Sequence, residues 1–208
     1  MRIGLTQRVD EIAAYGERRD ALDQKWGELL GKLGIFAIPL SNRTPDPKAY
    51  LEALDLDGFI LTGGNDLSHL PNPVNAAPER DRLEQAVLEY AQTHELPLLG
   101  VCRGLQFINA ALGGSLVSVE GHVGQCHKVD WNGETVSVNS FHNWTIPSDG
   151  LASQLTATAI DDEGNVEGFR HQNLPIEGIM WHPEREEPFA KQDETFLRSF
   201  FFSKGSNS

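Results

Sequence analysis

The feature that most constrains this sequence is an apolar run, LPLLGV at 96–101, that passes directly into CRGLQ. A strand without polar residues is typical of the centre of a parallel sheet, because helices cover both of its faces. Apolar residues then recur at 105, 108 and 112, the spacing of one helix face, and a glycine pair follows at 113–114. The segment therefore predicts a buried strand, a tight turn at Cys102 and a helix.

The rest of the first half of the chain alternates in the same way. Strands are expected at 2–8, 35–40 and 58–66, and helical spacing covers 22–33, 48–54 and 78–90. Beyond residue 115 the segments are rich in β-formers, with a hairpin signal at 161–165, and a helix is expected at 194–202. The pattern predicts an α/β fold: a mostly parallel central sheet with helices on both faces, plus a β-rich C-terminal part with a hairpin. We expect one domain over 1–203 and a disordered tail at 204–208.

Charge and composition exclude several classes of protein. The 208 residues include 17 Lys+Arg and 30 Asp+Glu, a formal net charge of -13, which disfavours nonspecific binding to nucleic acid or an anionic membrane. No basic leader with an apolar core and no membrane-length apolar stretch is visible, so we expect a cytoplasmic protein. Cys102 and Cys126 are too few for a disulfide scaffold and are expected to be free thiols.

Cys102 is a candidate nucleophile because it stands between a strand and a helix. A side chain on such a turn is presented above the helix N-terminus, which favours a thiolate. The turn is crowded, and Gly100 and Gly104 provide the space that it needs. The alternative is a buried structural thiol, since free cysteines are among the most buried residues.

Two other segments supply partners for this cysteine. His182 and Glu184 follow an apolar strand in GIMWHPERE, and a histidine held by a carboxylate can take and return the proton of a thiol. Cys102, His182 and Glu184 thus form a candidate triad. In LTGGND, the N–H of Gly64 could join the N–H of Arg103 in an oxyanion hole, although an ordinary glycine turn explains the same motif.

The motifs G-x-C-x-G-x-Q, G-G and H-P-E, in this order, resemble the class I glutamine amidotransferase-like superfamily, which includes stand-alone γ-glutamyl hydrolases. The resemblance implies a flavodoxin-like fold of the glutamine amidotransferase type. It implies that Cys102 attacks a γ-glutamyl amide to give a thioester that water hydrolyses. His182 would act as base and then acid, oriented by Glu184, and Gly64 and Arg103 would be the oxyanion donors.

The same resemblance places the glutamyl part of the substrate at four residues, Gln106, Ser140, Phe141 and His142. It implies no cofactor. Met180 departs from the superfamily, which often has glutamine two residues before the histidine. This departure weakens an assignment as an ammonia-donating subunit, but a glutaminase subunit of a partner synthetase stays an alternative, as does a noncatalytic domain with the same fold.

A closer resemblance is carried by GLTQR, GERRDALDQKWGELL, TGGNDLS, NSFHN and GIMWHPERE. Together they resemble the branch that hydrolyses γ-glutamyl-CDP-amidate in capsule phosphoramidate synthesis, which implies glutamate and cytidine diphosphoramidate as products. Another γ-glutamyl amine or peptide is the alternative substrate. The oligomeric state is left open.

A diphosphate on so acidic a protein requires local cations. Arg8, Arg18 and Arg19 are the candidates, with Lys25, Arg103 and Arg185 as further cations nearby, although Arg18 and Arg19 also fit ordinary surface charge. Trp26 could stack on a base, but its spacing with leucines favours a core position.

A metal site is not expected from the sequence. His122, Cys126 and His127 lie close together in the chain, but a second ligand pair, such as C-x2-C, is missing.

Overall fold

The computed structural model describes residues 1–202, so the expected tail at 204–208 lies outside the described residues. The helices are α1 (Lys25–Lys32), α2 (Pro47–Leu54), α3 (Pro78–His94), α4 (Arg103–Ala111), the short 3-10 helix η1 (Pro183–Arg185) and α5 (Lys191–Phe202). The strands are β1 (Arg2–Leu5), β2 (Arg8–Ile12), β3 (Glu17–Ala21), β4 (Phe36–Pro39), β5 (Gly58–Leu61), β6 (Leu98–Val101), β7 (Val117–Ser118), β8 (Val123–Trp131), β9 (Glu134–Phe141), β10 (Trp144–Thr145), β11 (Leu155–Asp161), β12 (Val166–His171) and β13 (Ile176–Ile179).

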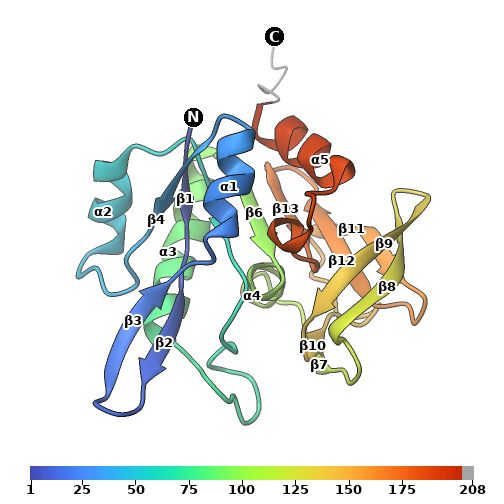
Figure 1. Ribbon diagram of the computed structural model, residues 1–208, viewed down its shortest axis with the longest axis horizontal. Coiled ribbons are helices and arrows are strands. Elements are labelled where there is room, and N and C mark those ends of the chain that lie inside the picture. Colours follow the sequence, from blue (N-terminus) through green and yellow to red (C-terminus); the bar gives the residue numbers. More distant parts are fainter. Residues whose placement is uncertain (203–208) are drawn as a thin grey trace.

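One nine-stranded sheet runs through the molecule in the order β4-β1-β5-β6-β13-β12-β11-β8-β9 (Figure 1). The first five strands pair in parallel. The last four pair antiparallel, and β11 and β12 form the hairpin expected at 161–165. The predicted fold class is confirmed, and the parallel and β-rich parts share a single sheet.

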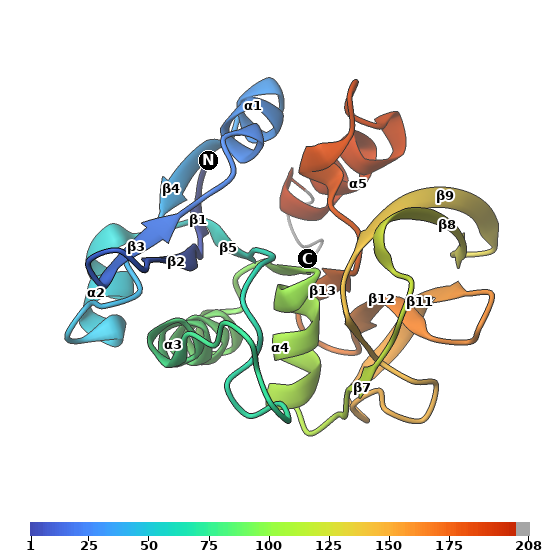
Figure 2. The same ribbon diagram turned by 60° about the horizontal axis from the view of Figure 1, so that its bottom comes forward.

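Helices cover both faces of the parallel part, with α1 and α5 on one side and α3 and α4 on the other (Figure 2). The alternation of strand residues explains this arrangement: Leu98 packs into the core with α3 and α4, and Leu99 packs into the core with α1 and α5. All four residues of β6 are buried, as the apolar run predicts. Trp26 belongs to the second core and is 1% exposed, which confirms its core position.

The N-terminal region differs from the prediction. The first strand ends at Leu5 rather than at residue 8, and residues 8–21 form a separate two-stranded ribbon, β2–β3. Sequence reasoning missed β3 because its sequence, ERRDA, is charged on both faces and lacks the apolar alternation of a half-buried strand. This ribbon projects from the lower left of the molecule in Figure 1.

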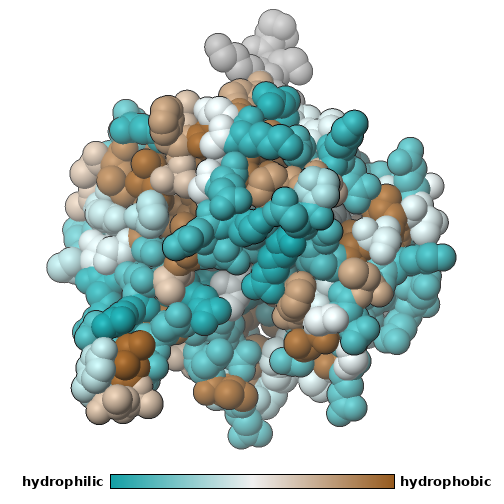
Figure 3. Space-filling view, in the orientation of Figure 1, coloured by the Kyte–Doolittle hydropathy of each residue, from teal (hydrophilic) through white to brown (hydrophobic). Residues whose placement is uncertain are grey.

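The carboxyl ends of β1, β5, β6 and β13 lie at one edge of the sheet, the edge at which parallel α/β sheets bind ligands. Thr6, Thr62, Cys102 and His182 all come shortly after these strands. On the face seen in Figure 3 the surface is mostly hydrophilic, and its hydrophobic side chains form separate patches. Within residues 1–202, no helix combines the length and the hydropathy that crossing a membrane requires.

Candidate active site

Cys102 occupies a strained turn between β6 and α4. Its φ is 52° and its ψ is -107°, a conformation that non-glycine residues rarely adopt and that is typical of functional turns. A Cβ at position 100 would come 2.7 Å from the backbone of Gly104, and a Cβ at position 104 would come 2.0 Å from the Leu61 oxygen. The predicted need for glycine at both positions is confirmed.

His182 and Glu184 meet where β13 leads into η1. His182 Nδ1 lies 2.7 Å from Glu184 Oε1, and both side chains are almost completely buried. Burial lowers the pKa of His182, but interactions with Cys102 and Glu184 outweigh it and raise the pKa to about 9. The structure therefore places His182 and Glu184 in direct contact, as the sequence predicted. The N–H of Cys102 donates to the Ile179 carbonyl at 2.8 Å, three residues before His182.

Asn139 holds the backbone of this histidine in place. Its side chain donates to the His182 carbonyl and accepts from the His182 N–H, each at 2.9 Å. Two residues along the strand, the Phe141 ring meets His182 edge-on with centroids 5.9 Å apart. Sequence reasoning chose Phe141 but missed Asn139, although both lie in the segment VNSFHN.

Arg80 supports the glycine turn, and sequence reasoning also missed this residue. This fully buried side chain donates to the carbonyls of Thr62, Gly63 and Gly64. Because a trans peptide directs its N–H away from its C=O, the Gly64 N–H points away from Arg80. Gly64 has a φ of +84°, which favours glycine.

A buried ion network surrounds Arg80. Glu84 accepts from Arg80 Nε at 2.8 Å, from Thr6 at 2.8 Å and from Arg103, which also pairs with Asp81. Burial lowers the pKa of Arg80 to about 10. The sequence contained a signal for this ion network. Arg80 and Glu84 lie on the same helix face as the apolar Leu83, and charges buried in this way are almost always paired.

The Arg103 side chain is therefore occupied by Glu84 and Asp81, and it is not among the described residues that line the cavity beside His182. Its N–H, by contrast, belongs to the first residue of α4, where no intrahelical acceptor exists.

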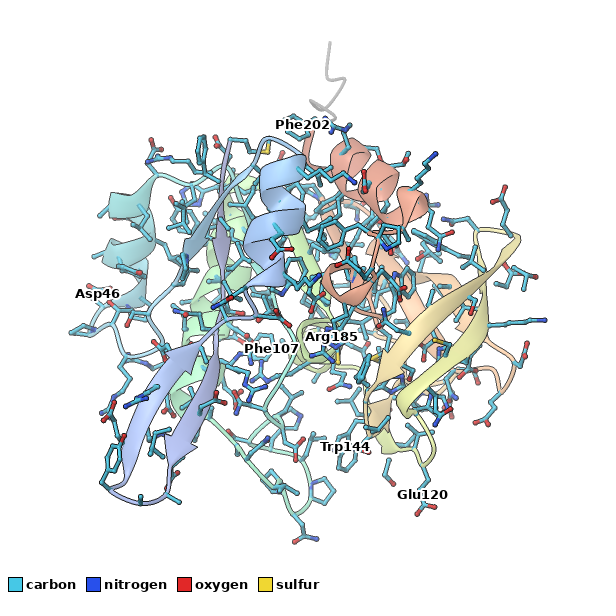
Figure 4. All side chains as sticks on the ribbon, in the orientation of Figure 1. Asp46, Phe107, Glu120, Trp144, Arg185 and Phe202 are labelled. Atoms are coloured by element: carbon cyan, nitrogen blue, oxygen red, sulfur yellow. The ribbon has the colours of Figure 1, made fainter. Side chains whose placement is uncertain are left out.

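A cavity of about 230 Å³ opens beside these residues. Its lining includes Arg8, Trp26, Thr62, Gly63, Gly64, His182, Glu184 and Arg185. Arg185 lies between the β2–β3 ribbon and the β8–β9 hairpin, near the centre of the view in Figure 4, with its guanidinium 4.5 Å from the Phe141 ring centroid.

The other predicted arginines lie elsewhere. Arg18 pairs with Glu79 at 2.8 Å and with Glu11 at 3.1 Å, and it lines a separate surface pocket with Arg43 and Arg82. Arg19 pairs with Glu17 within the β2–β3 ribbon. Among the described residues that line the cavity, neither arginine is present.

The polar side chains of the predicted glutamyl-binding residues contact backbone carbonyls of this chain. The Gln106 amide donates to the Trp144 carbonyl at 2.9 Å, and Ser140 Oγ donates to the His122 carbonyl at 2.6 Å. His142 Nδ1 lies 3.0 Å from the same Trp144 carbonyl. The His142 imidazole is thus turned toward the carbonyl, and its side chain is buried.

Comparison with known proteins resolves the family. The sequence profile of the Peptidase C26 family matches residues 3–131 and 119–184. The chain belongs to the Peptidase C26 family. It is a hydrolase homologue within the glutamine amidotransferase-like group, as the motifs around Cys102 and His182 predicted.

Individual relatives of this Peptidase C26 chain support the same family assignment. It is 37% identical to the γ-glutamyl-CDP-amidate hydrolase of Campylobacter jejuni, over 89% of this chain and 91% of that protein. It is 32% identical to anthranilate synthase component 2 of Thermococcus kodakarensis, over 64% and 68% of the two chains. The crystal structure of a glutamine amidotransferase from Thermotoga maritima superposes with a TM-score of 0.66 at 17% identity, over 96% and 82% of the chains, which shows the shared fold.

Proposed function

We propose that this Peptidase C26 chain hydrolyses γ-glutamyl-CDP-amidate to glutamate and cytidine diphosphoramidate. One observation supports the chemistry: His182 Nδ1 lies 2.7 Å from Glu184 Oε1 in a buried pair, at the sheet edge that also carries the strained turn of Cys102. The identity of the substrate rests on the Campylobacter jejuni relative, which aligns over nine-tenths of both chains.

In the first step, the Cys102 thiol gives its proton to His182 and Sγ attacks the γ-carbonyl carbon, while the carbon–oxygen π electrons move onto the oxygen. The N–H groups of Gly64 and Arg103 stabilise this oxyanion, a contribution of about 3–4 kcal/mol for a single donor in comparable enzymes. Collapse of the adduct breaks the C–N bond, and His182 gives a proton to the leaving nitrogen. The products of this step are cytidine diphosphoramidate and a glutamyl thioester.

In the second step, water attacks the thioester while His182 takes one of its protons. The C–S bond breaks, and glutamate is released with Cys102 regenerated. Glu184 keeps Nδ1 protonated and the ring oriented, so that Nε2 is the atom that exchanges protons. The burial of both side chains supports these roles, because buried charges interact strongly.

The cavity contains two guanidinium groups that can bind the diphosphate of the leaving group. Arg8 and Arg185 line it in a protein of net charge -13, and a guanidinium can form two parallel hydrogen bonds with a phosphate. Within residues 1–202, the one ion pair of Arg8 is with Asp10, at 2.7 Å, and Arg8 is half exposed, so a diphosphate can compete for it.

The test is glutamate release from γ-glutamyl-CDP-amidate, from glutamine and from a γ-glutamyl amine, measured on purified protein. We expect the nucleotide-linked substrate to have the highest kcat/KM and Cys102→Ala to abolish release. Cys126→Ala is the matched control, because Cys126 is exposed on β8 and should leave the rate unchanged. Equal turnover of all three substrates would remove the nucleotide from the proposal, and full activity of Cys102→Ala would remove the mechanism.

A second candidate function is a glutaminase subunit that delivers ammonia to a synthetase, favoured by the similarity to anthranilate synthase component 2. It predicts that glutamine is the best substrate and that turnover rises when a partner is added. The same three-substrate assay distinguishes it.

A further inference from the structure

Three histidines and one glutamate converge between the β8–β9 hairpin and β12, beside the candidate active site. His122 precedes β8, His127 lies within it, His142 follows β9, and Glu167 lies on β12. The side chains of His142 and Glu167 are 0% and 1% exposed, and His122 is 9% exposed. The rings of His122 and His142 meet edge-on with centroids 4.9 Å apart.

These side chains leave polar atoms without hydrogen-bond partners. Within the described residues, the buried unpartnered atoms include His122 Nδ1, His127 Nε2, His142 Nε2 and Glu167 Oε1. His127 Nε2 does face Glu167 Oε2, at 3.3 Å. A buried polar group without a partner costs about 1–3 kcal/mol, so the other three in one cluster are unfavourable unless something else binds there. The mechanism proposed above uses none of these atoms.

The tautomer of His142 shows what kind of partner is required. Its Nδ1 donates to the Trp144 carbonyl, so in the neutral ring Nε2 carries a lone pair. That lone pair faces Glu167 Oε1 at 3.5 Å. Two electron-rich atoms this close in a buried site repel each other unless a positive species lies between them.

The spacing fits a metal ion better than a shared proton. A charge-assisted N–H···O bond is about 2.7–2.9 Å long. In tetrahedral zinc, Zn–N and Zn–O bonds of about 2.0–2.2 Å separate neighbouring ligand atoms by about 3.3–3.6 Å. The observed 3.5 Å matches the edge of that tetrahedron, and one ligand atom each of His122, His142 and Glu167 lie within 4.8 Å of one another.

We propose that His122, His142 and Glu167 form a zinc-binding site. His127 holds the second oxygen of the Glu167 carboxylate, since its Nε2 lies 3.3 Å from Glu167 Oε2. Imidazole and carboxylate ligands suit zinc, and three protein ligands leave the fourth tetrahedral position to water. The bond from His142 Nδ1 to a backbone carbonyl is the outer contact that zinc-bound histidines usually make.

The site would stabilise the segment that shapes the candidate active site. His142 and Gln106 share the Trp144 carbonyl as an acceptor, and Phe141, next to His142, packs against His182. A zinc ion would connect β9 to β12 at this point, across strands that lie far apart in the chain. We therefore assign it a structural role in positioning residues 138–143.

The sequence argued against a metal because the cluster of His122, Cys126 and His127 lacks a second ligand pair. The missing ligands are supplied by other strands, and Cys126, which is exposed, is not one of them.

The test uses the full chain, purified without a metal-affinity tag. Metal content is measured by inductively coupled plasma mass spectrometry, and Tm is measured on chelator-treated protein before and after addition of Zn²⁺. We expect one zinc per chain and a Tm increase of about 5–10 °C when free zinc is about a hundredfold above its Kd. Co²⁺ in place of zinc should give the visible absorption of a tetrahedral site.

The variants His142→Gln and Glu167→Gln should lose the bound zinc, the Co²⁺ absorption and the Tm increase. His94→Gln is the matched control, because His94 is exposed on α3, where it contacts the Tyr90 carbonyl and ring. Cys126→Ala tests the thiol. Both should keep one zinc.

Absence of zinc binding by the wild-type chain would overturn the proposal, and so would retention of zinc by Glu167→Gln. If a variant fails to fold, the wild-type titration and the Co²⁺ spectrum decide alone. None of these measurements depends on the substrate, so failure of the proposed hydrolase function would leave them unaffected.

Discussion

The surroundings of His182 suit both halves of an acyl-transfer reaction. Burial lowers the pKa of His182, but interactions with Cys102 and Glu184 outweigh this effect. The resulting pKa of about 9 keeps the ring protonated near neutral pH. A protonated His182 can give a proton to the leaving nitrogen without waiting for one from solvent. The ring acts as a base again after that transfer, when water must be activated.

Glu184→Gln tests this electrostatic balance. Removing the carboxylate removes one of the interactions that raise the pKa of His182, so the alkaline limb of kcat/KM should move from near pH 9 to lower pH. The rate should fall about a hundred- to ten-thousandfold, since the tautomer is no longer fixed. Glu187→Gln, at an exposed residue paired with Lys25, is the control for the pH–rate profile. An unchanged limb would show that Glu184 does not tune His182.

Among the elements, the crossing of α4 over β5 and β6 is the most tightly packed part of the site. Gly104 allows this approach because a Cβ there would overlap the Leu61 backbone. This contact determines how far the Cys102 turn lies from the sheet.

Gly104→Ala should therefore destabilise the fold by about 3 kcal/mol or more, because backbone atoms on both sides would have to move. Gly31→Ala is a control of opposite sign: nothing lies within 4 Å of that added Cβ in α1, and alanine favours a helix interior by about 0.5–1 kcal/mol. Urea denaturation of the two variants measures the difference. A stable Gly104→Ala protein would contradict the packing argument.

Asp193 in α5 makes stability depend on pH. Burial raises its pKa to about 6, although it accepts a hydrogen bond from Trp181 Nε1 at 3.0 Å. The folded state then binds a proton more tightly than the unfolded state, so this stabilisation is present below about pH 4 and is lost as pH rises through about 6. Asp193→Asn should be about 1–3 kcal/mol more stable than the wild type at pH 8, by thermal unfolding, and equally stable at pH 4. Equal stability at pH 8 would contradict this assignment.

At the scale of the whole molecule, charge is distributed unevenly. The chain carries -13, and several arginines, such as Arg18 and Arg19, are paired with carboxylates at the surface. Arg8 and Arg185 line the cavity beside His182, together with Asp10, Asp23 and Glu184. Binding of an anionic leaving group would therefore depend on direct contacts with the two arginines, because the overall field is repulsive.

Arg8→Gln and Arg185→Gln should each raise KM for γ-glutamyl-CDP-amidate about tenfold to a hundredfold, with a smaller change in kcat. The KM for a γ-glutamyl amine without phosphate should not change, and Arg198→Gln, on α5, is the control. Steady-state kinetics on both substrates measures this. Equal effects on the two substrates would place these arginines outside the diphosphate site.

Sequence reasoning succeeded where the interactions are local. The apolar run at 96–101, the crowding around Cys102 and the pairing of His182 with Glu184 all depend on periodicity and sterics over a few residues. These signals predicted the parallel sheet and the edge that carries the candidate site, and the resemblance of the motifs to a known superfamily predicted the family. They failed for β3, whose charged sequence has no buried face.

The tertiary structure alone decided which distant side chains meet. In the structure, Arg80 binds the carbonyls of the glycine turn, and the Arg103 side chain belongs to a buried ion network. Arg8 lines the cavity, whereas Arg18 and Arg19 do not. The fold also brought His142 and Glu167 to His122. The physical reason is that a buried charge or an unpaired nitrogen is defined by its partners, and strand order and register, not spacing along the chain, determine those partners.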